Sequence, residues 1–422
     1  MTRSRLLLAV LLATPLARAD VIVVDAAGGG DFTSLTAAIA AAANGDTLLV
    51  RAGIYAEPGP VIIDDKALTI TGEWAEQVHE VGVTIQQGLV IRDLPPTKRV
   101  MLLNLAIYGT PGTATAVPTA ALTVQDNNSH VRVQSCLLFG GGGSDNSSPD
   151  GVAAVEVVNG ISTALVDCLL IGGYGQFSPD LGVITGNGGP GIVLAGGQVL
   201  VTEGFVQAGS GGGNIPGGWA QGGSGGSGIV HDSGSLLIVG SSASGGDGGT
   251  SHFGGDGGDG ISMGATGFAW LMGGSGASGG EGGWSDVGPA GDDGLDLFDP
   301  AGLTTDFGGT IHGFDVTSPL REGQMGTLVL GGHPTDTTLL FASVTLHQLP
   351  FPGYQGVLML APTALLGPFV LGPPGNQDVP FLAPDLPAGV ETLIVHVQPA
   401  YSGTDGVKLG TGRVLLLLDA AF

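Results

Sequence analysis

A long repeat in the middle of the chain constrains its fold more than any other feature of the sequence. Glycine clusters followed by a short apolar run recur as GNGGPGIVL, GGSGGSGIV and GGDGGDGIS, and a degenerate copy reads AGDDGLDL. The apolar residues after the glycines are Ile192, Ile229, Ile261 and Leu295, so the steps are 37, 32 and 34 residues. Because one such unit cannot bury its apolar face alone, several units must stack to form a continuous core.

Each unit contains short runs of β-forming residues. In the copy that begins at Ile229, one apolar run precedes a Ser-Gly turn, a second run covers 236–239, and a long segment of Gly, Ser and Asp leads to the next copy. Such runs between turn residues indicate strands. Parallel strands stacked along an axis repeat their inward residues at every coil. The sequence therefore predicts an all-β parallel β-helix whose long Gly-rich repeats cover about 121–297.

The first residues have the features of a secretory signal peptide. Two arginines precede an apolar run at 6–12, and ARA at 17–19 matches a small-residue cleavage site. We expect 1–19 to be removed. No later apolar run reaches the roughly 20 residues that a membrane-spanning helix needs. These features predict a secreted protein, extracellular, at the cell surface or in a periplasm, without membrane insertion.

The charge of the chain is strongly acidic. It has 12 Lys+Arg and 37 Asp+Glu, which gives a net charge of −25, and removal of the three arginines in the signal peptide leaves 9 − 37 = −28. No Lys or Arg occurs from Val133 to Leu320. A surface without cations cannot neutralise phosphates. We therefore do not expect nucleic acid or an anionic membrane as a partner.

The segment VIVVDAAGGGDFTSLTAAIAAAANGDTLLVRAGIYAE at 21–57 reads as strand, glycine turn, helix and strand. Thr33 or Ser34 can cap a helix over 35–43. The order of GGGDF, an alanine-rich helix and NGDTLLVRAGIYAE resembles the N-terminal segment of pectin methylesterases and other secreted right-handed β-helix proteins of the pectate-lyase-like superfamily. In those families the helix covers the N-terminal end of the β-helix. The resemblance implies a right-handed β-helix with an N-terminal capping helix here.

The catalytic motifs of these families are absent from the sequence. Pectin methylesterases carry an acid pair in a GNxDFIFG-like strand and an arginine in an LGRPW-like segment, and neither string occurs. Pectate lyases use a strand-borne arginine with calcium-binding acids, and no arginine lies on the middle coils. The NTD, DD, HG and RIK set of polygalacturonases is absent as a set. The resemblance therefore extends to the scaffold and assigns no catalytic residue.

The composition changes at about Thr317, where glycine becomes rarer and proline more frequent. Apolar runs follow at 327–330, 338–346, 357–360, 392–397 and 413–418. Runs of this length between Pro and Gly turns predict a β-sandwich over 317–422, after a β-helix over 20–316. One interpretation is that this domain covers the open end of the β-helix, whose edge would otherwise invite aggregation.

Four acidic residues of the repeats form a candidate calcium site. With a step of 34 residues, Asp247 matches Glu281 and Asp259 matches Asp293. Stacking in register would place like charges about 5 Å apart, which is destabilising unless a cation lies between them. Carboxylate oxygens are ligands that calcium prefers. The alternative is that flexible glycine loops splay apart in solvent.

Aromatic residues of the Gly-rich loops are candidate ligand-binding residues. Trp219 and Trp284 could form a platform for sugar rings, which stack on aromatic faces. The alternative is that loop aromatics, with Trp270 among them, fasten the loops to the wall of the β-helix.

The two cysteines occupy matching places in neighbouring repeats. Cys136 lies in VRVQSCLLFGG and Cys168 in TALVDCLLIGG, 32 residues later. Stacked coils would place them about 4.8 Å apart, so they form either a disulfide or a ladder of buried thiols. In-register parallel neighbours hold their Cβ atoms too far apart for an unstrained bridge, which favours the thiol ladder.

Two hypotheses about function follow. The first is a non-catalytic β-helix protein of the cell surface or extracellular matrix that binds a polysaccharide or a surface partner with its loop face and requires no cofactor, calcium aside. The second is a polysaccharide-degrading enzyme, a lyase or a glycoside hydrolase. The missing catalytic motifs and cations favour the first, and a test for turnover separates the two.

Overall fold

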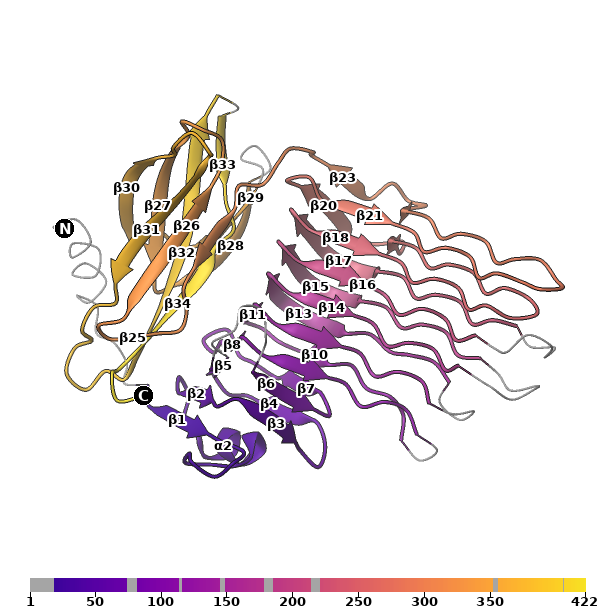
Figure 1. Ribbon diagram of the computed structural model, residues 1–422, viewed down its shortest axis with the longest axis horizontal. Coiled ribbons are helices and arrows are strands. Elements are labelled where there is room, and N and C mark those ends of the chain that lie inside the picture. The colour runs from indigo at the N-terminus through magenta and orange to yellow at the C-terminus, as the bar shows by residue number, and fades with distance from the viewer. Residues whose placement is uncertain are drawn as a thin grey trace.

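The computed structural model consists of a parallel β-solenoid and a sheet-built domain that lies along one side of it (Figure 1). The structure describes residues 19–73, 82–113, 116–144, 149–177, 185–213, 221–351, 356–404 and 406–422. Apart from Ala19, the predicted signal peptide lies outside these residues. The one helix among the described residues is too short to span a membrane.

Each full coil of the solenoid contributes to three faces. Face 1 consists of β4 (Val61–Asp64), β7 (Leu89–Arg92), β10 (Leu122–Gln125), the first halves of β13 (Val155–Val166), β15 (Ile192–Thr202) and β17 (Ile229–Val239), then β19 (Ile261–Met263) and β22 (Leu297–Phe298). Face 2 consists of β1 (Val21–Val24), β2 (Thr47–Val50), β5 (Leu68–Gly72), β8 (Val100–Leu103), β11 (His130–Gln134), the second halves of β13, β15 and β17, then β20 (Phe268–Met272) and β23 (Thr304–Asp306). Face 3 consists of β3 (Gly53–Ala56), β6 (Val83–Gln86), β9 (Ala106–Tyr108), β12 (Leu137–Phe139), β14 (Leu169–Ile171), β16 (Phe205–Gln207), β18 (Ser242–Ser244) and β21 (Gly276–Ser278).

The strand register confirms the parallel β-helix and most of the repeat steps. Ile192 pairs with Ile229 and Ile229 with Ile261, all in parallel strands. The partner of Ile261 in the last coil is Leu297, so the assignment of Leu295 to this position is wrong. Leu295 instead belongs to the glycine segment that precedes the strand, and its N–H bonds to the coil before.

The Ser-Gly turn that was expected to separate the two apolar runs of a unit does not interrupt the strand in the structure. Residues 229–239 form one strand, β17, because the chain bends at Gly234 (φ 103°) without leaving the sheet. Its register with β15 shifts at this bend. A left-handed φ at this position favours glycine, since a Cβ would be strained there.

Helix α2 (Leu35–Ala41) covers the N-terminal end of the solenoid, two residues shorter than expected. Ser34 is the N-cap, and its hydroxyl accepts the N–H of Ala37 at 3.3 Å. Leu35 and Ile39 are buried against the first coils. The helix thus closes the apolar interior at one end, which the N-terminal segment had predicted.

A buried histidine lies within the apolar interior of the solenoid. His231 on β17 is fully buried in the column that runs from Leu194 to Met263. Within the described part of the chain neither ring nitrogen makes a well-formed hydrogen bond, although the backbone of Gly234 lies near. Burial lowers the pKa of His231, and the contact with Gly234 offsets only part of this effect. The folded protein therefore holds a neutral imidazole at this site.

We expect His231→Met to stabilise the protein. A buried polar group without a partner costs about 1 to 3 kcal/mol, and methionine already occupies the same column one coil later. Because the folded-state pKa is lowered, the unfolded chain takes up a proton first as the pH falls below about 6.5, and stability is lost there. The rise in Tm should therefore be larger at about pH 5 than at pH 7. A lower Tm for the variant at both pH values would contradict this account.

The C-terminal domain is a β-sandwich whose two sheets enclose their own apolar core. One sheet consists of β24 (Phe314–Val316), β26 (Met325–Gly331) and β31 (Asn376–Leu382). The other consists of β25 (Leu320–Arg321), β34 (Arg413–Leu418), β32 (Thr392–Gly403), β27 (Thr337–Ser343), β30 (Ala364–Val370) and β33 (Gly406–Leu409), with β28 (Leu346–Phe351) and β29 (Gly356–Leu360) as a separate hairpin. Since β24 pairs with β26, the domain begins at about 314 rather than at 317.

The larger sheet of this domain packs on face 2 of the solenoid (Figure 1). Leu416 and Leu418 share one buried apolar cluster with Leu49 and Leu103 of the solenoid, and Met359 shares another with Leu200. Both faces of β34 are therefore buried, which explains its continuous apolar run. The domain covers the side of the solenoid, so the interpretation that it covers the open end is wrong.

Candidate functional site

The Gly-rich segments that connect face 3 to face 1 form long projections, which we call the glycine arms (Figure 1). Each arm has an outgoing layer that continues face 3 and a returning layer that continues face 1. The described outgoing layers are 140–144, 172–177, 208–213, 245–250 and 279–284, and the described returning layers are 149–153, 185–190, 221–228, 254–260 and 290–295. The arms lie on the opposite side of the solenoid from the C-terminal domain.

The arms are ordered by a hydrogen-bond pattern with a period of three residues. Gly209 donates its N–H to Gly189 of the returning layer at 2.8 Å, and Gly211 donates to Asp247 in the next coil of its own layer at 2.8 Å. In each triplet, one N–H bonds to the next coil of the same layer and the following N–H bonds to the other layer. The third residue, such as Ser210, points outward. A three-residue period is that of a polyproline II helix. The expectation of flexible loops that splay apart is therefore wrong.

Acidic side chains at the outward positions complete this pattern. Asp247 accepts the N–H of Glu281 in the next coil at 3.0 Å, as the predicted pairing of these two residues required. Asp259 accepts the N–H of Leu295 at 2.9 Å, so its predicted pairing with Asp293 is wrong. These carboxylates satisfy backbone N–H groups that would otherwise face solvent.

The last arm, which has no following coil, uses two carboxylates as caps. Asp293 accepts the N–H of Gly282 at 2.8 Å, and Asp296 accepts the N–H of Gly279 at 3.0 Å. In earlier arms the equivalent N–H groups bond to the next coil, as Gly248 does to Glu281. An exposed sheet edge invites aggregation, and inserted charges prevent it.

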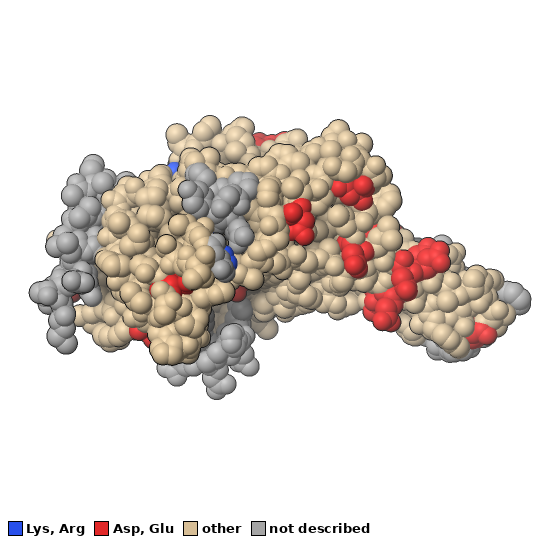
Figure 2. All heavy atoms as spheres, turned by 90° about the horizontal axis from the view of Figure 1, so that it is seen from above, with Lys and Arg blue, Asp and Glu red and all other residues tan. Residues whose placement is uncertain are grey.

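Acidic side chains gather over the end of the solenoid and its arms (Figure 2). No Lys or Arg lies between 133 and 320 to balance them. Among the described residues no group of three or more His, Cys, Asp or Glu side chains could hold a metal ion. The calcium site at Asp247, Asp259, Glu281 and Asp293 stays a prediction, and a metal there would have to compete with the backbone N–H groups.

The aromatic candidates occupy different environments. Trp219 lies outside the described residues. Trp284 is 61% exposed at the end of an outgoing layer, and Tyr174 and Phe177 are also more than half exposed on an outgoing layer. Trp270 is not a loop residue, so its assignment to the loop aromatics is wrong: it lies on strand β20 of face 2 and packs edge to face on Phe307, with ring centroids 5.7 Å apart. It packs against the apolar cluster that face 2 shares with the C-terminal domain.

Face 3 continues this exposed aromatic set, which we call the aromatic surface. Tyr108 and Phe139 stack with ring centroids 4.8 Å apart, and Phe205 stands in the neighbouring column. The outgoing layers extend directly from these strands, so Tyr174, Phe177 and Trp284 lie on the same outer side. Sequence reasoning missed Tyr108, Phe139 and Phe205, because alternation within a three-residue strand gives too short a pattern to assign a face.

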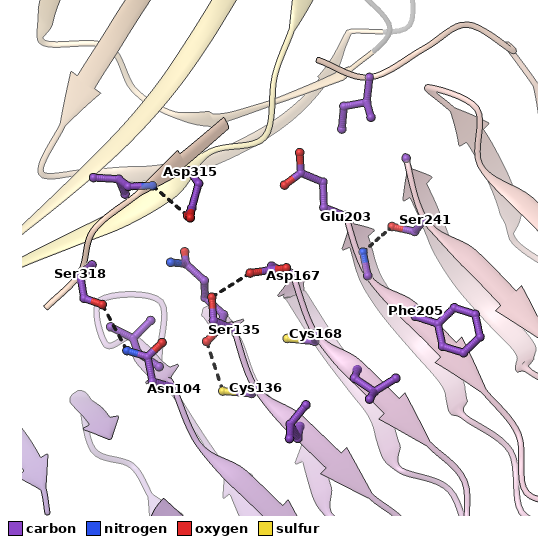
Figure 3. Close-up of a pocket in the computed structure, with 18 of the residues that line it drawn as sticks. Asn104, Ser135, Cys136, Asp167, Cys168, Glu203, Phe205, Ser241, Asp315 and Ser318 are labelled. Carbon is purple, nitrogen blue, oxygen red and sulfur yellow. Dashed lines mark hydrogen bonds between the residues drawn. The ribbon is translucent and has the colours of Figure 1, made fainter. Parts of the chain in front are cut away.

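A recess of about 740 Å³ lies where the solenoid meets the C-terminal domain (Figure 3). Its solenoid wall carries side chains from successive coils, namely Asn104, Ser135, Asp167 and Glu203. Asp315 and Ser318 contribute from the C-terminal domain, and Leu137, Leu169 and Phe205 form an apolar side. The recess combines polar groups from two domains with an apolar wall, as ligand sites commonly do.

The polar residues of the solenoid wall share one backbone conformation. Asn104, Ser135, Asp167 and Glu203 all have φ between 51° and 57°, at the corner between face 2 and face 3. The same corner is occupied by glycine in the following coils, where Gly240 has φ 55°. Left-handed backbone is uncommon for residues other than glycine and costs about 1 kcal/mol or more. Four successive coils therefore keep a polar side chain at this corner despite the backbone cost, and these side chains line the recess.

Arg413 of β34 binds two carboxylates of the recess. Its guanidinium lies 2.5 Å from Glu203 Oε2 and 3.2 Å from Asp167 Oδ2, and Ser135 Oγ donates to Asp167 at 3.1 Å. The Arg413 side chain is 5% exposed, and that of Glu203 is 16% exposed. Burial raises the pKa of Glu203, the Arg413 charge lowers it, and Asp167 raises it further. Two carboxylates in different environments can act as acid and base.

The recess was not predicted from the sequence, because Arg413 and Glu203 are 210 residues apart. The only sequence signal is a polar residue two positions before each of four successive face 3 strands, β9, β12, β14 and β16.

Both cysteines are buried free thiols in the structure. Cys136 and Cys168 precede β12 and β14, which pair in register, so they stack as predicted. Burial raises the pKa of both thiols, that of Cys168 to about 12.

Comparisons with known proteins add little to this geometry. No model of a known protein family matches the sequence, and no curated protein matches it. Among solved structures, the PL6 family alginate lyase AlyGC aligns with 12% identity and a TM-score of 0.32 over 69% of this chain and 40% of that chain. The Escherichia coli protein YbhC aligns with 14% identity and a TM-score of 0.30 over 61% and 72%, and pectate lyase Pel9A with 10% and 0.29 over 70% and 83%.

These TM-scores are too low to carry an argument about family or function. The strand pairing itself defines the class, a parallel β-helix protein with glycine arms and a lateral β-sandwich.

Proposed function

We propose that this chain is a secreted, non-catalytic β-helix protein of the cell surface or extracellular matrix that binds polysaccharide with its aromatic surface. The observation that carries the proposal is the position of exposed aromatic side chains on face 3 and on the outgoing layers that continue it. Exposed aromatic faces are suited to apolar ring faces of sugars. The arms extend the aromatic surface beyond the solenoid wall with Tyr174, Phe177 and Trp284, which exposes these three side chains to a large ligand.

The charge of the protein narrows the ligand class. The arms carry acids and no Lys or Arg, so a polyuronate or another polyanion would be repelled. A neutral polysaccharide is the ligand that fits both the aromatic side chains and this charge.

The test of this proposal is retention of the mature chain, 20–422, by a panel of neutral and anionic polysaccharides in affinity electrophoresis. We expect retention by a neutral polymer. The double variant Tyr174→Ala/Phe205→Ala should weaken it about thirtyfold, since two aromatic contacts at about 1 kcal/mol each contribute about 2 kcal/mol. Phe298→Ala removes an equally exposed ring from face 1 and should leave binding unchanged. Retention by no neutral polymer, or equal loss in the Phe298 variant, would refute the assignment.

The recess favours a second candidate function, a polysaccharide-degrading enzyme. Two carboxylates of the recess support this candidate. The pKa of Glu203 is raised, and Asp167 is half exposed. Two carboxylates on opposite sides of a glycosidic bond suffice for hydrolysis. The same polymers are therefore followed by size exclusion, with and without calcium. Shortening of a polymer that is lost in a folded Glu203→Gln variant would establish this activity and contradict the non-catalytic proposal.

A further inference from the structure

The interface between face 2 and the C-terminal domain contains basic side chains from both partners, which we call the basic cluster. Arg99, His130 and Arg132 come from the solenoid, and His347 and His396 come from the C-terminal domain. Val100 and Val131 pair in register, so the preceding residues Arg99 and His130 are also neighbours in adjacent coils. The cluster therefore concentrates positive or potentially positive groups at a contact between domains.

Arg132 is the permanently charged centre of this cluster. Its side chain is 1% exposed, and its acceptors are neutral: Gln134 Oε1 at 2.9 Å and the carbonyl of Gly412 across the interface. Gln134 Oε1 also accepts the N–H of Val414 at 3.0 Å. Burial, with the nearby charge of Arg413, lowers the pKa of Arg132 to about 9. An arginine held by neutral acceptors leaves its charge uncompensated, so a further cation nearby is costly.

Two histidines of the cluster are held neutral at pH 7. His396 is 4% exposed, and burial followed by the charges of Arg132 and Arg99 lowers its pKa well below the usual value. Burial, Arg99 and His347 lower the pKa of His130. Within the described chain, Nδ1 of each ring is buried without a hydrogen-bond partner.

The other polar groups of this interface supply no free negative charge to the cluster. They include Ser162, which contacts Gln348, and Glu391, which accepts the N–H of Val21. The remaining carboxylates already face arginines: Asp167, Glu203 and Asp315 lie beside Arg413, and Glu73 pairs with Arg51 and Arg321. The groups whose charges lower the pKa values of His130 and His396 are all basic. Protonation of either ring would thus add a charge with no counter-ion.

We propose that the contact between the solenoid and the C-terminal domain is released by acid, when His130 and His396 bind protons. The two new charges lie beside Arg99 and Arg132 in a buried interface, and the repulsion is relieved when the domain moves off face 2. The recess has walls from both domains. Release of the contact therefore opens the recess to large molecules in acid and closes it at neutral pH.

The expected size of the effect follows from proton linkage. For each histidine that is neutral in the closed form and titrates normally in the open form, the ratio of open to closed protein rises about tenfold per pH unit below about 6.5. The two histidines together give up to about 100-fold per unit. A closed form that dominates at pH 7 by several powers of ten can thus open between about pH 6 and pH 4.5.

The experiment is small-angle X-ray scattering with hydrogen exchange on 20–422, from about pH 8 to about pH 4.5. We expect the radius of gyration to rise on acidification and to return on back-titration. Amides of 413–418 should lose protection while those of the solenoid strand 229–239 keep it. A radius that stays constant to about pH 4.5, or simultaneous loss of protection in both strands, would overturn the proposal.

Variants separate this contact from general acid unfolding, to which His231 and His312 contribute because burial lowers the pKa of each. The double variant His130→Gln/His396→Gln should stay closed over the whole range, whereas His252→Gln on a glycine arm should respond as the wild type does. Arg99→Gln should shift the opening to lower pH. If the double variant does not fold, this single variant tests whether the basic cluster controls the opening. An unchanged midpoint in Arg99→Gln or an unchanged response in a folded double variant would refute the role of the cluster.

Discussion

Gly209→Ala should destabilise the glycine arms by about 3 kcal/mol, the upper end of typical overpacking costs. A Cβ atom at residue 209 would lie 2.0 Å from the carbonyl oxygen of Gly173 and 2.5 Å from its carbonyl carbon. This neighbour cannot retreat, because Gly173 itself donates its N–H to Val152 and accepts the N–H of Gly189. The substitution must therefore separate layers that many hydrogen bonds hold together.

The measurement is hydrogen exchange of the arm amides, with the Tm as a global readout. Amides of 186–189 and 222–228 should lose protection in Gly209→Ala. The matched control is Ser210→Ala, because residue 210 occupies the outward position of the same triplet, where a side chain is already present. If both variants exchanged alike, the close packing of the layers would not be the reason for the Gly-Gly-X pattern.

Arg413→Met should destabilise the folded chain by about 3 kcal/mol or more, measured by denaturant unfolding. The variant removes the charge that compensates Glu203 and Asp167, and removal of one partner from a buried ion pair leaves an uncompensated charge. It also removes the hydrogen bond from Arg413 Nε to the Phe314 carbonyl at 3.0 Å. Because β34 forms much of the contact with face 2, the loss should also loosen the two domains.

Two further variants test the cause of this loss. The combination of Arg413→Met with Glu203→Gln should recover part of the stability, since the uncompensated carboxylate is then gone. Arg92→Met breaks an exposed pair with Asp64 and should cost less than about 1 kcal/mol. A loss at Arg92 as large as that at Arg413 would show that burial does not govern the effect.

The repeat step predicted the neighbour of one acidic residue correctly and that of another incorrectly. The 34-residue step placed Asp247 beside Glu281, and the structure has them in adjacent coils. The same step failed for Asp259, whose neighbour is Leu295, because the last arm is two residues longer on its returning side. Glycine segments contain no apolar residue to fix their register, so single steps cannot be read from the sequence there.

The sequence by itself determined the parallel β-helix, the helix that covers its N-terminal end and the change to a second β domain. Each of these depends on contacts between neighbouring residues or neighbouring repeats, which leave a periodic trace in the chain. The stacked cysteines Cys136 and Cys168 belong to the same class of contact.

Only the tertiary structure decided where the second domain lies, that the glycine segments form ordered layers, and that a recess and a basic cluster form at the domain contact. Arg413 meets Glu203 across 210 residues of sequence, and Arg132 meets Gly412 across 280. Such pairs occur once, so no period reveals them. The strength of these pairs comes from their burial where the two domains meet. Burial there depends on how the folded surfaces fit together, and no local run of residues encodes it.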